Sequence, residues 1–126
     1  MKKELQEELF AIEPKWFNRS NMQVSLMCFG FEVGDGWFVL LRELLHQIKK
    51  SNPPEDFEVV QVKEKWGGLR FYTHNENDEI LGAIHLAETL SDLFCEECGE
   101  RGKVGGKGWV QTLCRECRDA KTGGGN

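Results

Sequence analysis

Two short cysteine pairs near the C-terminus are the residues of this sequence best suited to bind a metal ion. Both pairs have the form Cys-x-x-Cys, and fifteen residues separate them. This spacing is typical of a four-thiolate zinc centre, because each pair brings two sulfurs to one ion and the connecting loop lets the pairs meet. The sequence therefore predicts one zinc ion held by Cys95, Cys98, Cys114 and Cys117.

The chemistry of such a centre is limited by its ligands. Four thiolates fill every position of a tetrahedral zinc ion, so no bound water is left to be activated, and we expect a structural role for the metal. A redox-active dithiol and an iron–sulfur centre are the alternatives for the same four residues. The fifth cysteine, Cys28, stands alone on the apolar side of a predicted strand, where we expect a small buried side chain.

The residues around the cysteines predict a zinc finger over residues 95–121. Gly99 leaves room for a tight turn after the first pair. A glycine-rich loop at residues 102–108 leads into a strand that ends at Leu113, and residues 115–121 are compatible with a short helix. This order is typical of a treble-clef finger, with a plain zinc ribbon as the alternative. A structural zinc ion contributes on the order of 10 kcal/mol to folding, so its removal should unfold this segment.

Residues 1–94 carry the patterns of a core domain that must position the finger. Apolar residues recur at helical spacing in three segments. From Met22 to Cys28 they alternate with the period of a strand, and residues 57–72 contain many β-branched and aromatic residues. The predicted elements are a short helix over 2–13, a strand over 22–31, a long helix over 37–48 capped by Asp35, a hairpin over 57–74, and a second long helix starting at Asn77 or Asp78.

These elements predict an α+β fold. We expect a small antiparallel sheet with two or three packed helices and an appended C-terminal treble-clef- or ribbon-like zinc finger that packs on the core. The last residues, 122–126, are rich in glycine, and we expect them to form a flexible tail.

The hairpin offers a candidate binding face. Gly67 and Gly68 can adopt the positive φ angles of a tight turn, and in that register Trp66 lies on the apolar face. The other face could bind a nucleotide or another anion, because arginine contacts phosphate in a bidentate manner and tyrosine stacks on bases. A solvated or internally salt-bridged surface is the alternative. This face consists of two predicted pairs, Lys65 with Arg70 and Lys63 with Tyr72.

Charge is distributed unevenly along the chain. The formal net charge of −5 argues against a protein that coats nucleic acid through many basic side chains. Residues 76–97 contain seven acidic residues and no Lys or Arg, whereas residues 98–126 contain six basic and three acidic residues. The basic finger could contact nucleic acid, or its cations could offset the charge of the thiolates. The candidate residues are Lys103, Lys107, Arg115 and Arg118.

The histidines give little support for an enzyme. His46, His74 and His85 lie on different predicted elements. A nuclease built on a treble-clef finger requires histidines within the finger, and residues 95–126 contain none. We therefore expect a protein without catalytic residues.

Three segments of the chain resemble a group of small, largely uncharacterised proteins of bacteriophages, prophages and bacteria. The segments are residues 28–37, with the sequence CFGFEVGDGW, residues 62–72, with the sequence VKEKWGGLRFY, and the two Cys-x-x-Cys pairs. The resemblance covers most of the chain, and the middle segment is its most distinctive part. It implies an origin in a mobile element and zinc binding, and it identifies no substrate.

Together these features predict a zinc-stabilised binding module. The leading prediction is an accessory or host-directed protein of a phage or other mobile element that contacts another protein. Nucleic-acid binding by the finger and capture of a nucleotide by the hairpin face are the alternatives. No stretch approaches the roughly 20 apolar residues of a membrane span, and the N-terminus is charged and amphipathic, so we expect no membrane partner and a cytoplasmic location, in the bacterial host if phage-encoded.

Overall fold

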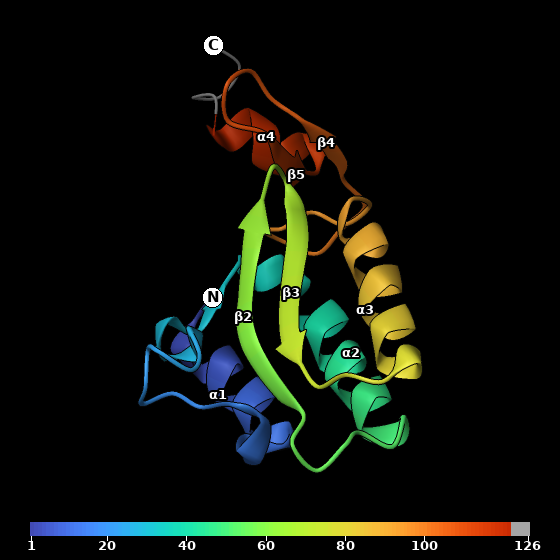
Figure 1. Ribbon diagram of the computed structural model, residues 1–126. Coiled ribbons are helices and arrows are strands. Elements are labelled where there is room, and N and C mark those ends of the chain that lie inside the picture. The colour runs from blue at the N-terminus through green and yellow to red at the C-terminus, as the bar shows by residue number, and fades with distance from the viewer. Residues whose placement is uncertain (122–126) are drawn as a thin grey trace.

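The computed structural model describes residues 1–121, so the predicted tail at 122–126 lies outside the described residues. The chain has the predicted α+β fold, with a three-stranded sheet, a two-stranded sheet and helices (Figure 1). The helices are α1 (Lys3–Ile12), α2 (Phe38–Lys50), α3 (Asp78–Ser91) and α4 (Arg115–Lys121). The strands are β1 (Phe31–Glu32), β2 (Glu58–Lys65), β3 (Gly68–His74), β4 (Lys103–Gly105) and β5 (Gln111–Leu113).

The core is a small sheet covered by helices on one side. Its strands lie in the order β1-β2-β3, where β2 and β3 form an antiparallel hairpin and the two-residue strand β1 runs parallel to β2. In Figure 1, α2 lies behind the hairpin and α3 lies beside β3, and no helix stands in front of the hairpin. The side of the hairpin that faces the viewer is therefore free of helices.

The two long helices follow their apolar periodicity. Leu41, Leu45 and Ile48 of α2 are fully buried, and Ile80 and Ile84 of α3 pack into the same core. The predicted cap of α3 is confirmed, because Asn77 Oδ1 accepts a hydrogen bond of 2.8 Å from Ile80 N.

The predicted cap of α2 is wrong. Asp35 does not cap the helix with its side chain, because its carboxylate accepts a hydrogen bond from Lys2 N. A 3-10 turn, Asp35–Trp37, leads into α2 in its place. Trp37 at the end of this turn is completely buried in the core.

The predicted strand over residues 22–31 is wrong for most of its length. Asn18 Oδ1 accepts hydrogen bonds from the backbone of Ser20 and Asn21, and these contacts fold the chain into turns that compete with strand formation. A 3-10 turn, Met27–Phe29, follows and directs Met27 into the core while Cys28 faces solvent. The expectation that Cys28 is buried is therefore wrong as well.

The hairpin turn lies one residue earlier than predicted. Trp66 and Gly67 occupy its centre with φ angles of 55° and 85°, so Lys65 pairs with Gly68 and Lys63 with Arg70. Each β2 residue therefore pairs with a β3 residue two positions earlier than predicted. Because side chains alternate between the two faces with a period of two, the predicted basic face keeps its members. Trp66 leaves the apolar face and is 69% exposed.

The finger follows the order expected of a treble clef. The first cysteine pair forms a turn at the end of the α3 segment, β4 and β5 form an antiparallel hairpin, and α4 carries Cys117 after Cys114. Figure 1 shows the finger stacked on the end of the core that is formed by the β2–β3 turn and the C-terminal end of α3. Part of the predicted loop at 102–108 is strand β4.

Candidate metal centre and basic surfaces

The structure brings the four predicted cysteines together in a site able to hold one metal ion. Their sulfurs all lie within 4.8 Å of one another, and Cys98 Sγ lies 3.7 Å from Cys114 Sγ. Two sulfurs bound tetrahedrally to one ion at about 2.3 Å are about 3.8 Å apart, whereas a disulfide bond is about 2.05 Å long. The observed spacing therefore matches the edge of a metal–thiolate tetrahedron.

The protonation of these thiols also favours a cation. Burial acts to raise the pKa of Cys95, but backbone hydrogen bonds with Cys114, Cys98 and Glu97 outweigh it and lower the pKa to about 7. Burial and hydrogen bonds with the neighbouring thiols raise the pKa of Cys117. Cys95 therefore ionises more readily than Cys117, because burial and hydrogen bonds with the neighbouring thiols favour the neutral form of Cys117. Binding of a divalent cation would stabilise all four thiolates.

Residues 34–37 attach the first cysteine pair to the core. Gly36 N donates to the backbone oxygen of Glu96 at 2.7 Å, and Gly34 N donates to the carboxylate of Glu96 at 2.9 Å. The buried indole of Trp37 donates through Nε1 to the backbone oxygen of Phe94 at 2.9 Å. The backbone of the turn packs so closely that a Cβ on Gly36 would lie 2.2 Å from the oxygen of Cys95. This segment therefore fixes the metal site to the start of α2.

The β2–β3 turn makes the second attachment. Thr112 Oγ1, fully buried on β5, donates to the backbone oxygen of Gly67 at 2.7 Å. Glu64 accepts a hydrogen bond from Gly67 N at 2.8 Å, and Leu69 N donates to Ser91 Oγ of α3. Residues 34–37 and the β2–β3 turn therefore hold the finger on the core.

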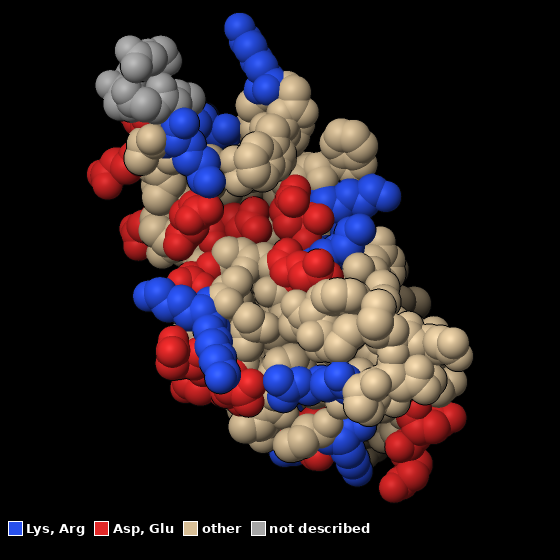
Figure 2. Space-filling view, turned by 90° about the vertical axis from the view of Figure 1, so that its left-hand side faces the viewer, with Lys and Arg blue, Asp and Glu red and all other residues tan. Residues whose placement is uncertain are grey.

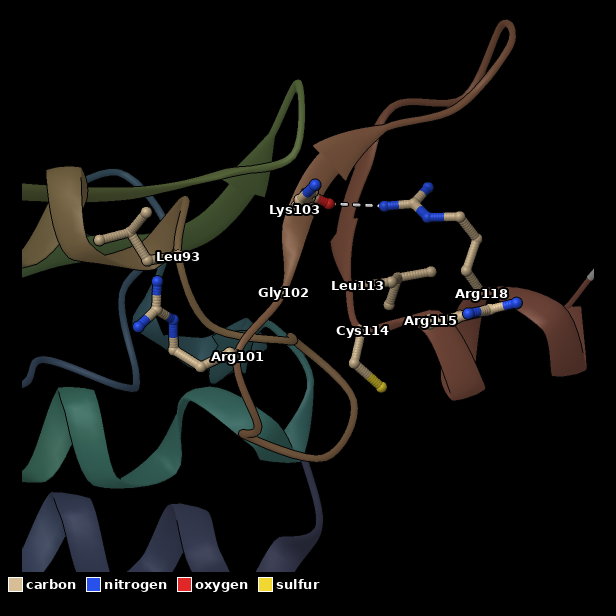
Figure 3. A pocket seen from close by; sticks show the side chains of 8 residues that line it. All are labelled: Leu93, Arg101, Gly102, Lys103, Leu113, Cys114, Arg115 and Arg118. Carbon is tan, nitrogen blue, oxygen red and sulfur yellow. Dashed lines mark hydrogen bonds between the residues drawn. The ribbon is translucent and has the colours of Figure 1, made fainter.

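Basic side chains of the finger surround one cavity of about 580 Å³ (Figure 3). Among residues 1–121 no carboxylate lines this cavity, and its apolar walls are Leu93 and Leu113. Three of the predicted residues contribute to it, and Arg101, which sequence reasoning missed, is a fourth cation. An isolated arginine in a polar stretch gives no signal in the sequence. The cations are Arg101, Lys103, Arg115 and Arg118, and we call this site the basic cavity.

The four cations of the basic cavity differ in exposure and in the hydrogen bonds that they form. Arg118 Nη2 donates to the backbone oxygens of Lys103 and Gln111, which ties α4 to the β4–β5 hairpin, and Figure 3 shows the first of these bonds. Arg101, Lys103 and Arg115 are exposed, and none of them forms an ion pair with a carboxylate of residues 1–121. Arg118 is therefore a structural residue, and the other three are available to an anion.

The remaining candidates lie elsewhere. Lys107 is exposed in the loop between β4 and β5 and does not line the basic cavity. On the hairpin face, Lys65 and Tyr72 are exposed and Lys63 is half-buried, while Arg70 turns back so that its Nη1 donates to the oxygen of Leu69. The face exists as predicted, but its arginine is partly engaged by its own strand.

Acidic groups concentrate at the junction of finger and core. Figure 2 shows red side chains gathered between the finger, at the top, and the core below it. Burial raises the pKa of Glu96, and the carboxylates of Glu64 and Glu97 raise it further. The basic cavity and the acidic junction therefore give the finger surfaces of opposite charge.

The histidines do not converge on any of these sites. His46 and His85 are exposed on α2 and α3, and His74 Nδ1 lies 3.4 Å from Glu58 Oε1 at the end of β3. None of the helices within residues 1–121 is long and apolar enough to cross a membrane.

Comparison of the chain with models of protein families, with curated proteins and with solved structures found no match.

Proposed function

We propose that this protein is a non-enzymatic binding module, stabilised by one structural zinc ion, that contacts nucleic acid through its basic cavity. The donor set supports zinc, because four thiolates at tetrahedral spacing suit this metal and leave no open position for catalysis. The observation that carries the proposal is the collection of four cations around a cavity that no carboxylate of residues 1–121 lines. Arg101, Lys103 and Arg115 form no ion pair with a carboxylate of residues 1–121, and positive charge of this kind attracts phosphate groups.

The arrangement also explains how an acidic protein could bind a polyanion. The net charge of −5 opposes general coating of nucleic acid. The basic cavity offers Arg101, Lys103 and Arg115 within one part of the finger. Binding is therefore restricted to this surface, and its affinity should depend strongly on salt.

Fluorescence anisotropy with labelled oligonucleotides tests this proposal on the zinc-loaded full chain. The triple variant Arg101→Gln, Lys103→Gln and Arg115→Gln should weaken binding and reduce the slope of log affinity against log salt by about 0.7–0.9 for each phosphate that is no longer neutralised. Lys15→Gln with Lys50→Gln is a control within residues 1–94, where both side chains are exposed. Equal affinity of the triple variant and the wild type would contradict the proposal.

A protein partner is the second candidate, and a groove between α2 and α3 favours it. The groove has a volume of about 260 Å³ and is lined by Leu40, Leu44 and Leu90 with Leu86, which is 60% exposed. An amphipathic helix of a partner could place its apolar side chains there. A pull-down from nuclease-treated lysate should capture a partner at high salt with the wild type and lose it with Leu86→Glu, and capture that is insensitive to this variant would contradict the groove.

The resemblance supports a role as an accessory or host-directed protein of a mobile element. Residues 28–37 and 62–72, which carry it, are the segments that attach the finger to the core. Five cysteines without a disulfide bond suit a reducing compartment, which supports the bacterial cytoplasm as the location.

A further inference from the structure

Two exposed tryptophans line one groove. Trp66, in the β2–β3 turn, is 69% exposed, and Trp109, in the β4–β5 loop, is 70% exposed. Both line a groove of about 250 Å³ together with Glu64, Lys65 and Val110, and we call it the tryptophan groove. Exposed indoles leave a large apolar surface in water, and neither ring stacks on another aromatic ring of residues 1–121.

Local structure does not explain a tryptophan at position 66. Residues 66 and 67 are the central residues of the two-residue turn, and both have positive φ angles. Asn, Asp and Gly are the residues that favour this conformation, whereas a bulky side chain at positive φ is strained. A strained residue that also exposes its ring to water indicates a role outside folding.

Trp109 is presented by a loop that requires glycine. Gly106 has a φ angle of 127°, and a Cβ at this position would lie 2.4 Å from the backbone oxygen of Trp109. Gly108 has a φ angle of 78°. The loop therefore turns tightly just before Trp109, which lines the groove together with Trp66 of the β2–β3 turn.

Two lysines lie at the tryptophan groove. Lys65 lines it, and Lys121 Nζ lies 5.9 Å from the centre of the Trp109 ring while it pairs with Glu97 Oε1 at 3.4 Å. Glu64 is the one carboxylate of residues 1–121 in its lining, and a hydrogen bond from Gly67 N already engages it. The groove therefore combines aromatic faces with positive charge, which is the chemistry that recognises bases and their phosphates.

We infer that the tryptophan groove binds unpaired bases, so that the nucleic acid held by this protein is single-stranded. This inference rests on the proposed nucleic-acid function. In a duplex the faces of the bases are stacked on one another and cannot reach an indole, whereas a single strand can turn its bases onto Trp66 and Trp109. A groove of this volume is smaller than a typical pocket for a whole ligand, which suits one planar ring at a time.

The β4–β5 hairpin contributes residues to both sites. Lys103 lines the basic cavity from the start of β4, and Trp109 follows β4 by way of the loop. The strand of nucleic acid places phosphates against Arg101, Lys103 and Arg115 and places bases at the tryptophan groove. Removal of the indoles should therefore reduce affinity for single strands and leave the salt-dependent attraction of the cavity in place.

The test compares one labelled oligonucleotide as a single strand and as a duplex, with the zinc-loaded full chain. Trp66→Ala and Trp109→Ala should each weaken single-strand binding by about 5- to 150-fold, the range expected for the loss of one stacked base. Trp66→Phe should recover part of the affinity, because phenylalanine keeps an aromatic face. Phe29→Ala is the matched control, because it removes an aromatic residue that is 56% exposed at a different surface.

The outcomes separate the inference from the function on which it rests. Duplex binding as tight as single-strand binding, with no effect of either tryptophan variant, would overturn the inference and leave nucleic-acid binding intact. Failure to bind either form would refute the proposed function itself. A poly-glutamate peptide serves as a polyanion without bases, and if it binds as tightly as the single strand and is equally sensitive to Trp109→Ala, the inference is wrong.

Discussion

At Gly36, the backbone of the first cysteine pair passes through the space that a side chain would fill. A Cβ there would lie 2.2 Å from the oxygen of Cys95 and 2.6 Å from the nitrogen of Gly99. Both atoms belong to backbone that a metal ion would hold in place, so neither can move freely. The metal centre therefore depends on a residue that is 59 positions away from Cys95 in the sequence.

This close approach predicts the effect of a single methyl group. Gly36→Ala should lower the free energy of unfolding by roughly 1–3 kcal/mol, the usual cost of overpacking, and should weaken metal retention because the cysteine turn must shift. Urea unfolding and competition with a chelator measure the two effects. Gly82→Ala is the control, because nothing lies within 4 Å of the added Cβ in α3 and alanine should stabilise the helix by up to about 1 kcal/mol. Equal effects of the two variants would show that the turn is not tightly packed.

The sequence predicted the roles of residues whose partners are close along the chain. It missed the roles of residues whose partners are distant. The spacing of the Cys-x-x-Cys pairs indicated the metal site, because each pair is a local unit, and the structure brings both pairs together. The docking role of Gly36 and the position of Arg101 at the basic cavity depend on contacts between separate elements. No local pattern marks such residues.

At the scale of elements, competition between local interactions explains which predicted helices and strands were confirmed and which were wrong. The helices were predictable because apolar periodicity and the Asn77 cap both favour them. Residues 22–31 have the alternation of a strand, but Asn18 and Asn21 bind backbone amides and form turns in their place. For the hairpin turn, Gly67-Gly68 was the sterically preferred centre, and docking of Gly67 onto Thr112 of β5 accompanies the shift to Trp66-Gly67.

Trp66 in the β2–β3 turn should lower the stability of the fold while it strengthens single-strand binding. Trp66→Asn should raise the free energy of unfolding by about 1 kcal/mol, because asparagine tolerates the positive φ angle better than tryptophan does. The same variant should lose single-strand affinity. Trp66→Ala separates the two effects, because alanine removes the indole and keeps most of the backbone strain, so its stability should stay close to that of the wild type. A Trp66→Asn protein that is less stable than wild type by about 1 kcal/mol or more would show that the indole contributes to packing.

At the scale of the whole molecule, the finger and the core are joined at two places around the proposed zinc ion. The segment at residues 34–37 holds the first cysteine pair, and the β2–β3 turn holds β5. Because both binding surfaces include residues of the finger, they require the metal even though the metal takes no part in binding. Loss of zinc should therefore abolish nucleic-acid binding while the core sheet and its helices keep their own buried contacts.

Alkylation of cysteine followed by intact mass measurement tests the central claim, one zinc ion on four thiolates, most directly. Cys28 and Cys98 are both exposed, so exposure alone would leave both reactive, whereas a bound zinc ion protects Cys98 and leaves Cys28 as the internal control. We predict one zinc ion per chain and one modified cysteine in the native protein, with all five cysteines modified after chelation in denaturant. Modification of Cys98 in the native protein, a disulfide bond within the cluster, or iron in place of zinc would contradict the account.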